Sequence, residues 1–210
     1  MSAVLARWGC SMGNGVPGLE LLRLWPSTFL HQSLPDQEER TRRLEVLARE
    51  QAVENIFASD DASVDWLKAN IIHGVVAYLR EAGFTRPPRC SVSGRFDIQR
   101  FTDIRPLRNR AGTYLAGTYV VTSPAPDEGL GAREDRRPGS VTFYDPRTGI
   151  NMNSIRRDPY LHYHHTVSLV PGLLLIWPAF VSYFEHPNHS REPAVRVAFD
   201  IHLEDGQGSP

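Results

Sequence analysis

The second half of the chain alternates short runs of β-branched and aromatic residues with turns rich in glycine and proline. This pattern constrains the fold more than any other feature of the sequence. From residue 89 onward it predicts strands at 91–101, 113–122, 140–144, 164–170, 173–177, 180–185 and 194–203. Short strands at this spacing are typical of an antiparallel sandwich or barrel. We therefore predict a mainly β (α+β) protein.

Two helices are predicted ahead of the strands. Asp36, with Glu39 three residues later, has the pattern of a capping box. Behind it, one apolar face alternates with charged positions, as in an amphipathic helix. A second helix is predicted to start at Ser63, and its apolar residues recur at every fourth position until Gly83 ends it. Two such helices can cover the outer face of one sheet.

The length of 210 residues suits one domain. Residues 1–18 are rich in glycine and show no periodicity, so we predict a disordered leader there. The single domain should span residues 19–204, with a helical layer at 36–83 and a barrel at 89–204. Residues 205–210 would then be a tail.

The formal net charge is −1, which gives no electrostatic reason to bind nucleic acid or an anionic membrane. The longest apolar run, from Leu173 to Phe180, contains Pro178 and is much shorter than the roughly 20 residues that cross a bilayer. No basic segment followed by a hydrophobic stretch opens the chain. We therefore expect a cytoplasmic protein without nucleic-acid or membrane partners.

Three phrases follow one another in the predicted barrel. They are Phe96-Asp-Ile-Gln-Arg100 with Tyr114-Leu-Ala-Gly-Thr-Tyr119, then Gly139-Ser-Val-Thr-Phe-Tyr-Asp-Pro-Arg147, then Pro171-Gly-Leu-Leu-Leu-Ile-Trp-Pro-Ala-Phe180 with Glu192-Pro-Ala-Val-Arg-Val-Ala-Phe-Asp200. In order and spacing they resemble the 2-oxoglutarate and Fe(II)-dependent oxygenases, in particular a small bacterial and phage group of prolyl-hydroxylase-like proteins. The resemblance spans roughly residues 20–204. It implies a double-stranded β-helix, the jelly-roll or cupin-like fold.

The same resemblance implies that the family's functional positions are replaced in this chain. The first two metal ligands fall on Arg108 and Arg110, and the distal histidine falls on Tyr183. The arginine that anchors the cosubstrate falls on Ala194. A guanidinium keeps its proton and has no free lone pair, so it cannot bind iron. We therefore expect no metal triad.

In such a barrel Arg108, Arg110 and Tyr183 would lie near the former metal position. Cations in a barrel need negative partners, which an anionic ligand can supply through bidentate hydrogen bonds. We predict these three residues to be catalytic. Four further residues are predicted to bind the substrate: Arg196, Tyr114, Asn109 and Gln99.

Two structural alternatives stay open. In the first, the arginines form an internal salt-bridge network without a ligand, with partners among Asp97, Asp103, Asp145 and Glu185. In the second, a metal site has moved to five histidines of the last third of the chain, which are His162, His164, His165, His186 and His189.

Three functions follow from these alternatives. The first is a metal-free biosynthetic enzyme that needs no cofactor and carries out cyclisation, isomerisation or elimination on an anionic small molecule. The second is an active dioxygenase that uses Fe(II) and 2-oxoglutarate with relocated histidine ligands. The third is a non-catalytic binding protein. Pairing into a homodimer is compatible with all three.

Overall fold

A computed structural model describes residues 19–24, 27–35, 37–50, 54–125, 137–147 and 164–204 of the chain. The predicted leader at 1–18, the tail at 205–210, Asp36 and His162 lie outside these ranges.

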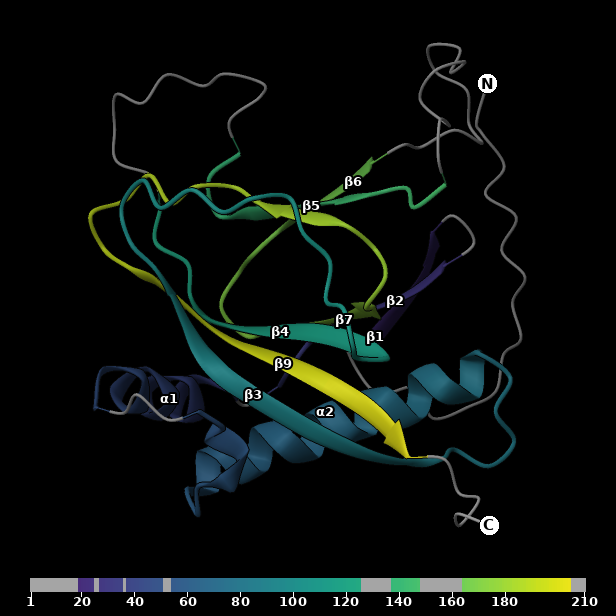
Figure 1. The fold of residues 1–210 in the computed structure, drawn as a ribbon. Helices are drawn as coiled ribbons and strands as arrows, with labels where there is room; N and C mark the ends of the chain where they lie inside the picture. The colour runs from purple at the N-terminus through teal and green to yellow at the C-terminus, as the bar shows by residue number, and fades with distance from the viewer. Residues whose placement is uncertain are drawn as a thin grey trace, which may run out of the picture.

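The described strands form two antiparallel sheets, one of six strands in the order β1-β2-β7-β4-β9-β3 and one of three in the order β6-β5-β8. The two sheets lie above one another with a core between them (Figure 1). Their bounds are β1 (Leu19–Leu24), β2 (Ser27–Ser33), β3 (Arg89–Gln99), β4 (Leu115–Thr122), β5 (Ser140–Tyr144), β6 (His164–Ser168), β7 (Leu173–Pro178), β8 (Tyr183–Glu185) and β9 (Ala194–Glu204).

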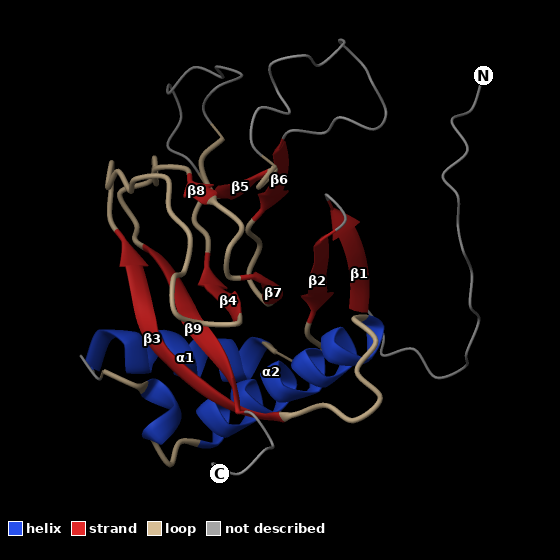
Figure 2. Ribbon diagram, turned by 45° about the vertical axis from the view of Figure 1, so that its right-hand side comes forward, coloured by secondary structure: helices blue, strands red, loops and turns tan. Residues whose placement is uncertain are grey.

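Two helices, α1 (Glu38–Glu50) and α2 (Ala62–Glu81), cover the outer face of the six-stranded sheet, as predicted (Figure 2). Their apolar faces meet the outer side chains of the sheet in one core, where Leu67, Ile176 and Phe199 are fully buried. The second helix begins one residue earlier than predicted, because Asp61 is its N-cap and accepts a hydrogen bond from the backbone N of Ser63 at 2.8 Å. None of the described helices combines the length and apolar character needed to cross a membrane.

The seven strands predicted from residue 89 onward are all present, although β6 and β8 are shorter than predicted. Strand β2 was not predicted. It buries Phe29 in the core between the sheets and Leu30 against the helices, so both of its faces carry apolar residues. A strand buried on both faces lacks the alternation that marks a strand exposed on one side.

Strand β3 forms one edge of the larger sheet and pairs only with β9 among the named strands. A short 3-10 helix, η1 (Ile56–Ala58), lies against it. The side chain of Asn55 accepts hydrogen bonds from the backbone N atoms of Phe57, at 3.2 Å, and of Gly94 in β3, at 3.1 Å. A Cβ atom on Gly94 would lie 2.6 Å from the Phe57 ring, so the close approach of η1 requires glycine there.

Candidate functional site

The space between the two sheets has an apolar part and a charged part. The apolar part contains buried residues of both sheets, namely Phe29, Ala116, Val120, Val141, Phe143, Val167, Leu169, Leu173, Leu175, Trp177, Ala179, Val181 and Tyr183. Beside it lies a cavity of about 140 Å³, lined by Arg95, Asp97, Arg105, Arg108, Arg110, Gly117, Thr118, Trp177, Tyr183, Glu185 and Ala198. This charged cavity is the candidate site.

Strand alternation brings part of this lining inward. Successive side chains of a strand point to opposite faces, so Arg95 and Asp97 of β3 both line the cavity. On β9, Ala198 lines it between Arg196 and Asp200. The strands therefore supply both charges and a small residue that leaves room for the cavity.

Arg105, Arg108 and Arg110 lie in the loop between β3 and β4. Backbone hydrogen bonds connect this loop to β8 and to Ala179, the residue that follows β7. The backbone N of Arg108 donates to the carbonyl of Tyr183 at 3.1 Å, and the N of Tyr183 donates back to the carbonyl of Arg108 at 2.8 Å. The backbone N of Arg110 donates to the carbonyl of Ala179 at 3.0 Å. These bonds hold Arg108 and Arg110 at the cavity.

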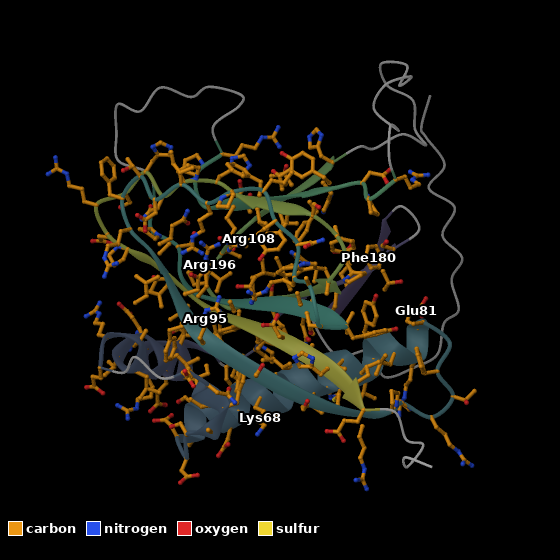
Figure 3. All side chains as sticks on the ribbon, viewed as in Figure 1. Lys68, Glu81, Arg95, Arg108, Phe180 and Arg196 are labelled. Carbon is orange, nitrogen blue, oxygen red and sulfur yellow. The ribbon has the colours of Figure 1, made fainter. Side chains whose placement is uncertain are left out.

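The carboxylate of Glu185 is the central anion of the site. It accepts hydrogen bonds from Arg105 Nη1 at 2.8 Å and from Arg108 Nη2 at 2.9 Å. Its other oxygen lies 3.6 Å from Nη1 of Arg196. Figure 3 shows Arg108 and Arg196 close together between the sheets. One buried carboxylate thus forms ion pairs with three guanidiniums.

Asp97 is the second anion of the cavity, and it is ion-paired with Arg105. Burial would raise the pKa of the Asp97 carboxyl, but the hydrogen bond from Arg105 and the charges of Arg196, Arg105 and Arg108 hold this pKa below its ordinary value. Burial likewise opposes the charge of Arg105, yet its bonds to Asp97 and Glu185 raise its pKa. Both groups are therefore charged in the folded protein.

Tyr183 lies at the junction of the charged and apolar parts and is buried. Its hydroxyl oxygen accepts a hydrogen bond from Arg108 Nε at 3.0 Å, and the guanidinium carbon of Arg108 lies 5.3 Å from the ring centroid. The ring packs edge-on against Trp177, with the centroids 5.2 Å apart. Because the oxygen acts as acceptor toward Arg108, the phenolic proton is left for a ligand.

The structure brings several predicted site residues together. Arg108, Arg110 and Tyr183 line one cavity, and Arg196 forms a longer ion pair, at 3.6 Å, with its central carboxylate. Gln99 is buried beside them, where its side-chain oxygen accepts from Arg196 Nη2 at 2.7 Å. Gln99 thus orients Arg196 and does not itself line the cavity.

The other two predicted substrate-binding residues lie elsewhere. Asn109 lies in the loop between β3 and β4, where its side chain is exposed, unlike those of its neighbours Arg108 and Arg110. Tyr114 is 43% exposed and lines a shallow surface depression with Phe84. Neither side chain lines the charged cavity.

The alternative of an internal salt-bridge network is partly realised. Arg108 pairs with Glu185, one of the candidate partners. Arg110 instead has Asp200 as its partner, at 3.1 Å between Nε and Oδ1, without the geometry of a hydrogen bond. Asp103 accepts a hydrogen bond from the backbone N of Arg100. The remaining candidate, Asp145, is paired with Arg147 outside the cavity.

Sequence reasoning missed four residues of this site: Arg95, Arg105, Trp177 and Asp200. A signal existed for Arg95 and Asp200, because the strand period of two places Arg95 on the same face as Asp97, and Asp200 on the same face as Arg196. Arg105 lies in a loop that has no period. No signal therefore marked it.

The histidines show no metal arrangement among the described residues, where no group of three His, Cys, Asp or Glu side chains could hold an ion. His164 and His165 lie on β6. His186 is half-buried, and its Nε2 is 2.8 Å from the hydroxyl of Thr142. Burial, together with the charge of Arg137, lowers the pKa of His186. His189 is partly buried in the connection between β8 and β9.

Comparison with solved structures decides the fold. A prolyl-4-hydroxylase from Pseudomonas putida superposes with a TM-score of 0.58 at 13% identity, covering 86% of this chain and 87% of the other. The chain has the double-stranded β-helix fold. The non-heme alpha ketoglutarate dependent epimerase SnoN from nogalamycin biosynthesis gives 0.53 at 12% identity, covering 87% of each chain. AviO1 from Streptomyces viridochromogenes Tue57 gives 0.54 at 9% identity, covering 87% of this chain and 92% of the other.

These similarities concern the fold alone, since all three identities lie far below 25%. Neither protein-family models nor curated proteins match the sequence.

Iron, which the sequence resemblance suggests, does not fit the residues of this cavity. Its two carboxylates, Asp97 and Glu185, are both bonded to arginines. A divalent cation placed beside them would also face the guanidiniums of Arg105 and Arg108 at close range, where like charges repel strongly. The residues of this cavity are therefore unsuited to hold a metal ion.

Proposed function

We propose that this protein is a metal-independent enzyme that binds an anionic small molecule in the charged cavity and catalyses proton transfer, as in an isomerisation, elimination or cyclisation. One observation carries the proposal. The guanidiniums of Arg95, Arg105, Arg108, Arg110 and Arg196 surround only the carboxylates of Asp97, Glu185 and Asp200, an excess of two positive charges among the described residues. Two of these positive charges have no counter-ion, so an anionic ligand would stabilise the site through hydrogen bonds to the guanidiniums.

The proposed chemistry follows from the position of Tyr183. A bound anion would lie beside the phenolic hydroxyl, which lines the cavity. Tyr183 would donate its proton to a ligand atom on which negative charge develops. Arg108, already 3.0 Å from the hydroxyl oxygen, would stabilise the phenolate left behind. The phenolate would then accept a proton from a C–H group of the ligand, so that one proton is added to the ligand and one is removed, Tyr183 is restored, and no cofactor is required.

Hydrogen exchange tests the catalytic part of the proposal without a known substrate. The protein is incubated in D₂O with a panel of small carboxylates and phosphate esters, and loss of C–H signals is followed by NMR. We expect at least one compound to exchange. Tyr183→Phe should then lower the exchange rate by about 10²–10⁴-fold while binding persists. Tyr114→Phe is the matched control, because that tyrosine lies outside the cavity.

A second measurement separates the proposal from an iron-dependent oxygenase. Protein purified without chelators or an affinity tag is analysed for metals before and after anaerobic addition of iron. We expect substoichiometric iron and no consumption of 2-oxoglutarate. Near-unity iron with turnover would contradict the proposal and direct attention to His164, His165, His186 and His189, together with His162. Anion binding without exchange of any compound would instead support a binding protein.

A further inference from the structure

One side chain that lines the cavity has a hydrogen-bond donor without a partner on the residues that the structure describes. Trp177 lines the cavity and is 4% exposed, yet its indole Nε1 has no hydrogen-bond partner among the described residues. An unpaired buried N–H is unfavourable, and such groups are rare in folded proteins. A ligand atom that accepts this hydrogen bond would remove the penalty.

The positive charges of the cavity exceed the negative charges at two places. Arg95 is exposed at the cavity and has no ion pair or hydrogen bond within the described part of the chain. Figure 3 places it on β3, below Arg108 and Arg196. Arg110 is ion-paired with Asp200, with 3.1 Å between Nε and Oδ1. Arg110 is therefore balanced by Asp200. The two excess positive charges reside at Arg95 and on the group of Arg105, Arg108 and Arg196, whose three guanidiniums share the two carboxylates of Asp97 and Glu185.

The size of the cavity limits the ligand. A volume of about 140 Å³ is close to that of cavities that hold benzene, so about six to eight non-hydrogen atoms can be enclosed. Gly117, Thr118 and Ala198 contribute little bulk to its wall. Larger groups would have to extend past Arg95 into solvent.

We infer that the ligand of this cavity is a compact dianion, held by Arg95 and by Arg105 and Arg108 and accepting a hydrogen bond from Nε1 of Trp177. The inference rests on the proposed function, in which the cavity binds an anion, and it adds the charge and size of that anion. Two negative charges balance the excess of two positive charges. A dicarboxylate and a phosphate monoester share this chemistry.

Matched pairs of probes test the charge requirement. Succinate is compared with succinamate, which has nearly the same shape and one charge fewer, and methyl phosphate is compared with dimethyl phosphate. Affinities are measured by calorimetry at pH 8 and low ionic strength, where the phosphate monoester is fully ionised. We expect at least one dianion to bind about ten-fold more tightly than its monoanionic counterpart, the scale of one hydrogen bond to a charged group. The pair that shows this preference identifies the source of the charge.

Two variants locate the effect. Arg95→Ala should reduce the preference to about three-fold or less, whereas Arg86→Ala, which removes an exposed charge outside the cavity, should preserve it. In ¹⁵N-labelled protein the indole signal that disappears in Trp177→Phe should shift when the dianion is added. An unmoved Trp177 signal on binding, or equal affinities within both pairs, would overturn the inference. If none of the four probes binds, anion binding itself fails, and the proposed function fails with it.

Discussion

Glu185→Gln is the substitution that most directly tests the charge balance of the site. The change keeps the shape of the side chain but removes the charge that serves Arg105, Arg108 and Arg196. Removing one partner of a buried ion pair typically costs about 3–5 kcal/mol. We expect a loss near the lower end, about 3 kcal/mol, because the side chain of Arg108 is 33% exposed and water can solvate part of its charge.

Urea unfolding at low ionic strength measures this loss. For a domain of this size, about 3 kcal/mol corresponds to a decrease in Tm of roughly 6–12 °C. Glu45→Gln is the control, since its pair with Arg49 is an exposed i,i+4 contact whose loss should cost about 0.5 kcal/mol or less. Sulfate should restore stability to Glu185→Gln more than to the parent protein, because it replaces the missing negative charge. A loss below about 1 kcal/mol would refute the reasoning, since the arginines would then not depend on this carboxylate.

Three further predictions concern the frame around the site. Gly117→Ala should destabilise the fold by about 2–3 kcal/mol in urea unfolding, because the new Cβ atom would lie 2.2 Å from the fully buried ring of Phe199; an unchanged midpoint would contradict that close approach. His186→Gln should lessen the loss of stability on acidification. The lowered pKa of His186 means that its neutral form stabilises the fold above pH 6.5 and that this contribution is lost as pH falls through the folded pKa; the exposed His202→Gln is the control, and parallel pH profiles would count against the effect. Leu67→Ala should cost about 2–5 kcal/mol, since Leu67 is fully buried between helices and sheet, and a loss under 1 kcal/mol would show that this core repacks.

The sequence predicted the strands of the barrel well because these depend on local features. Turn residues and β-branched runs mark β3 through β9, and the helices carry clear apolar faces. Strand β2 was missed because the alternation that identifies a strand is absent when Phe29 and Leu30 are both buried. Burial on two faces depends on α2, which packs on the Leu30 side, and on β5, whose Phe143 packs on Phe29. Both elements lie far from β2 in the sequence.

The charged cavity was predicted only in part, for a physical reason. The resemblance placed Arg108, Arg110 and Tyr183 together, and the structure brings them to one cavity. Their partners could not be read from local pattern, because Arg105 and Glu185 are 80 residues apart and meet only after the loop docks on β8. The directions of Asn109 and Tyr114 depend on loop backbone conformation, for which no periodicity exists.

The contact between Asn55 and Gly94 has a consequence for how this chain can associate with others. An edge strand offers unpaired backbone groups to any other strand, which is a common route to aggregation and to strand-swapped dimers. Here the backbone N–H of Gly94, in the middle of β3, already donates a hydrogen bond to the side chain of Asn55, and the ring of Phe57 lies over the same residue. An incoming strand would have to displace η1 together with the buried side chains of Ile56 and Phe57. Continuous pairing along β3 is thereby blocked, so a homodimer of this chain would need a different surface.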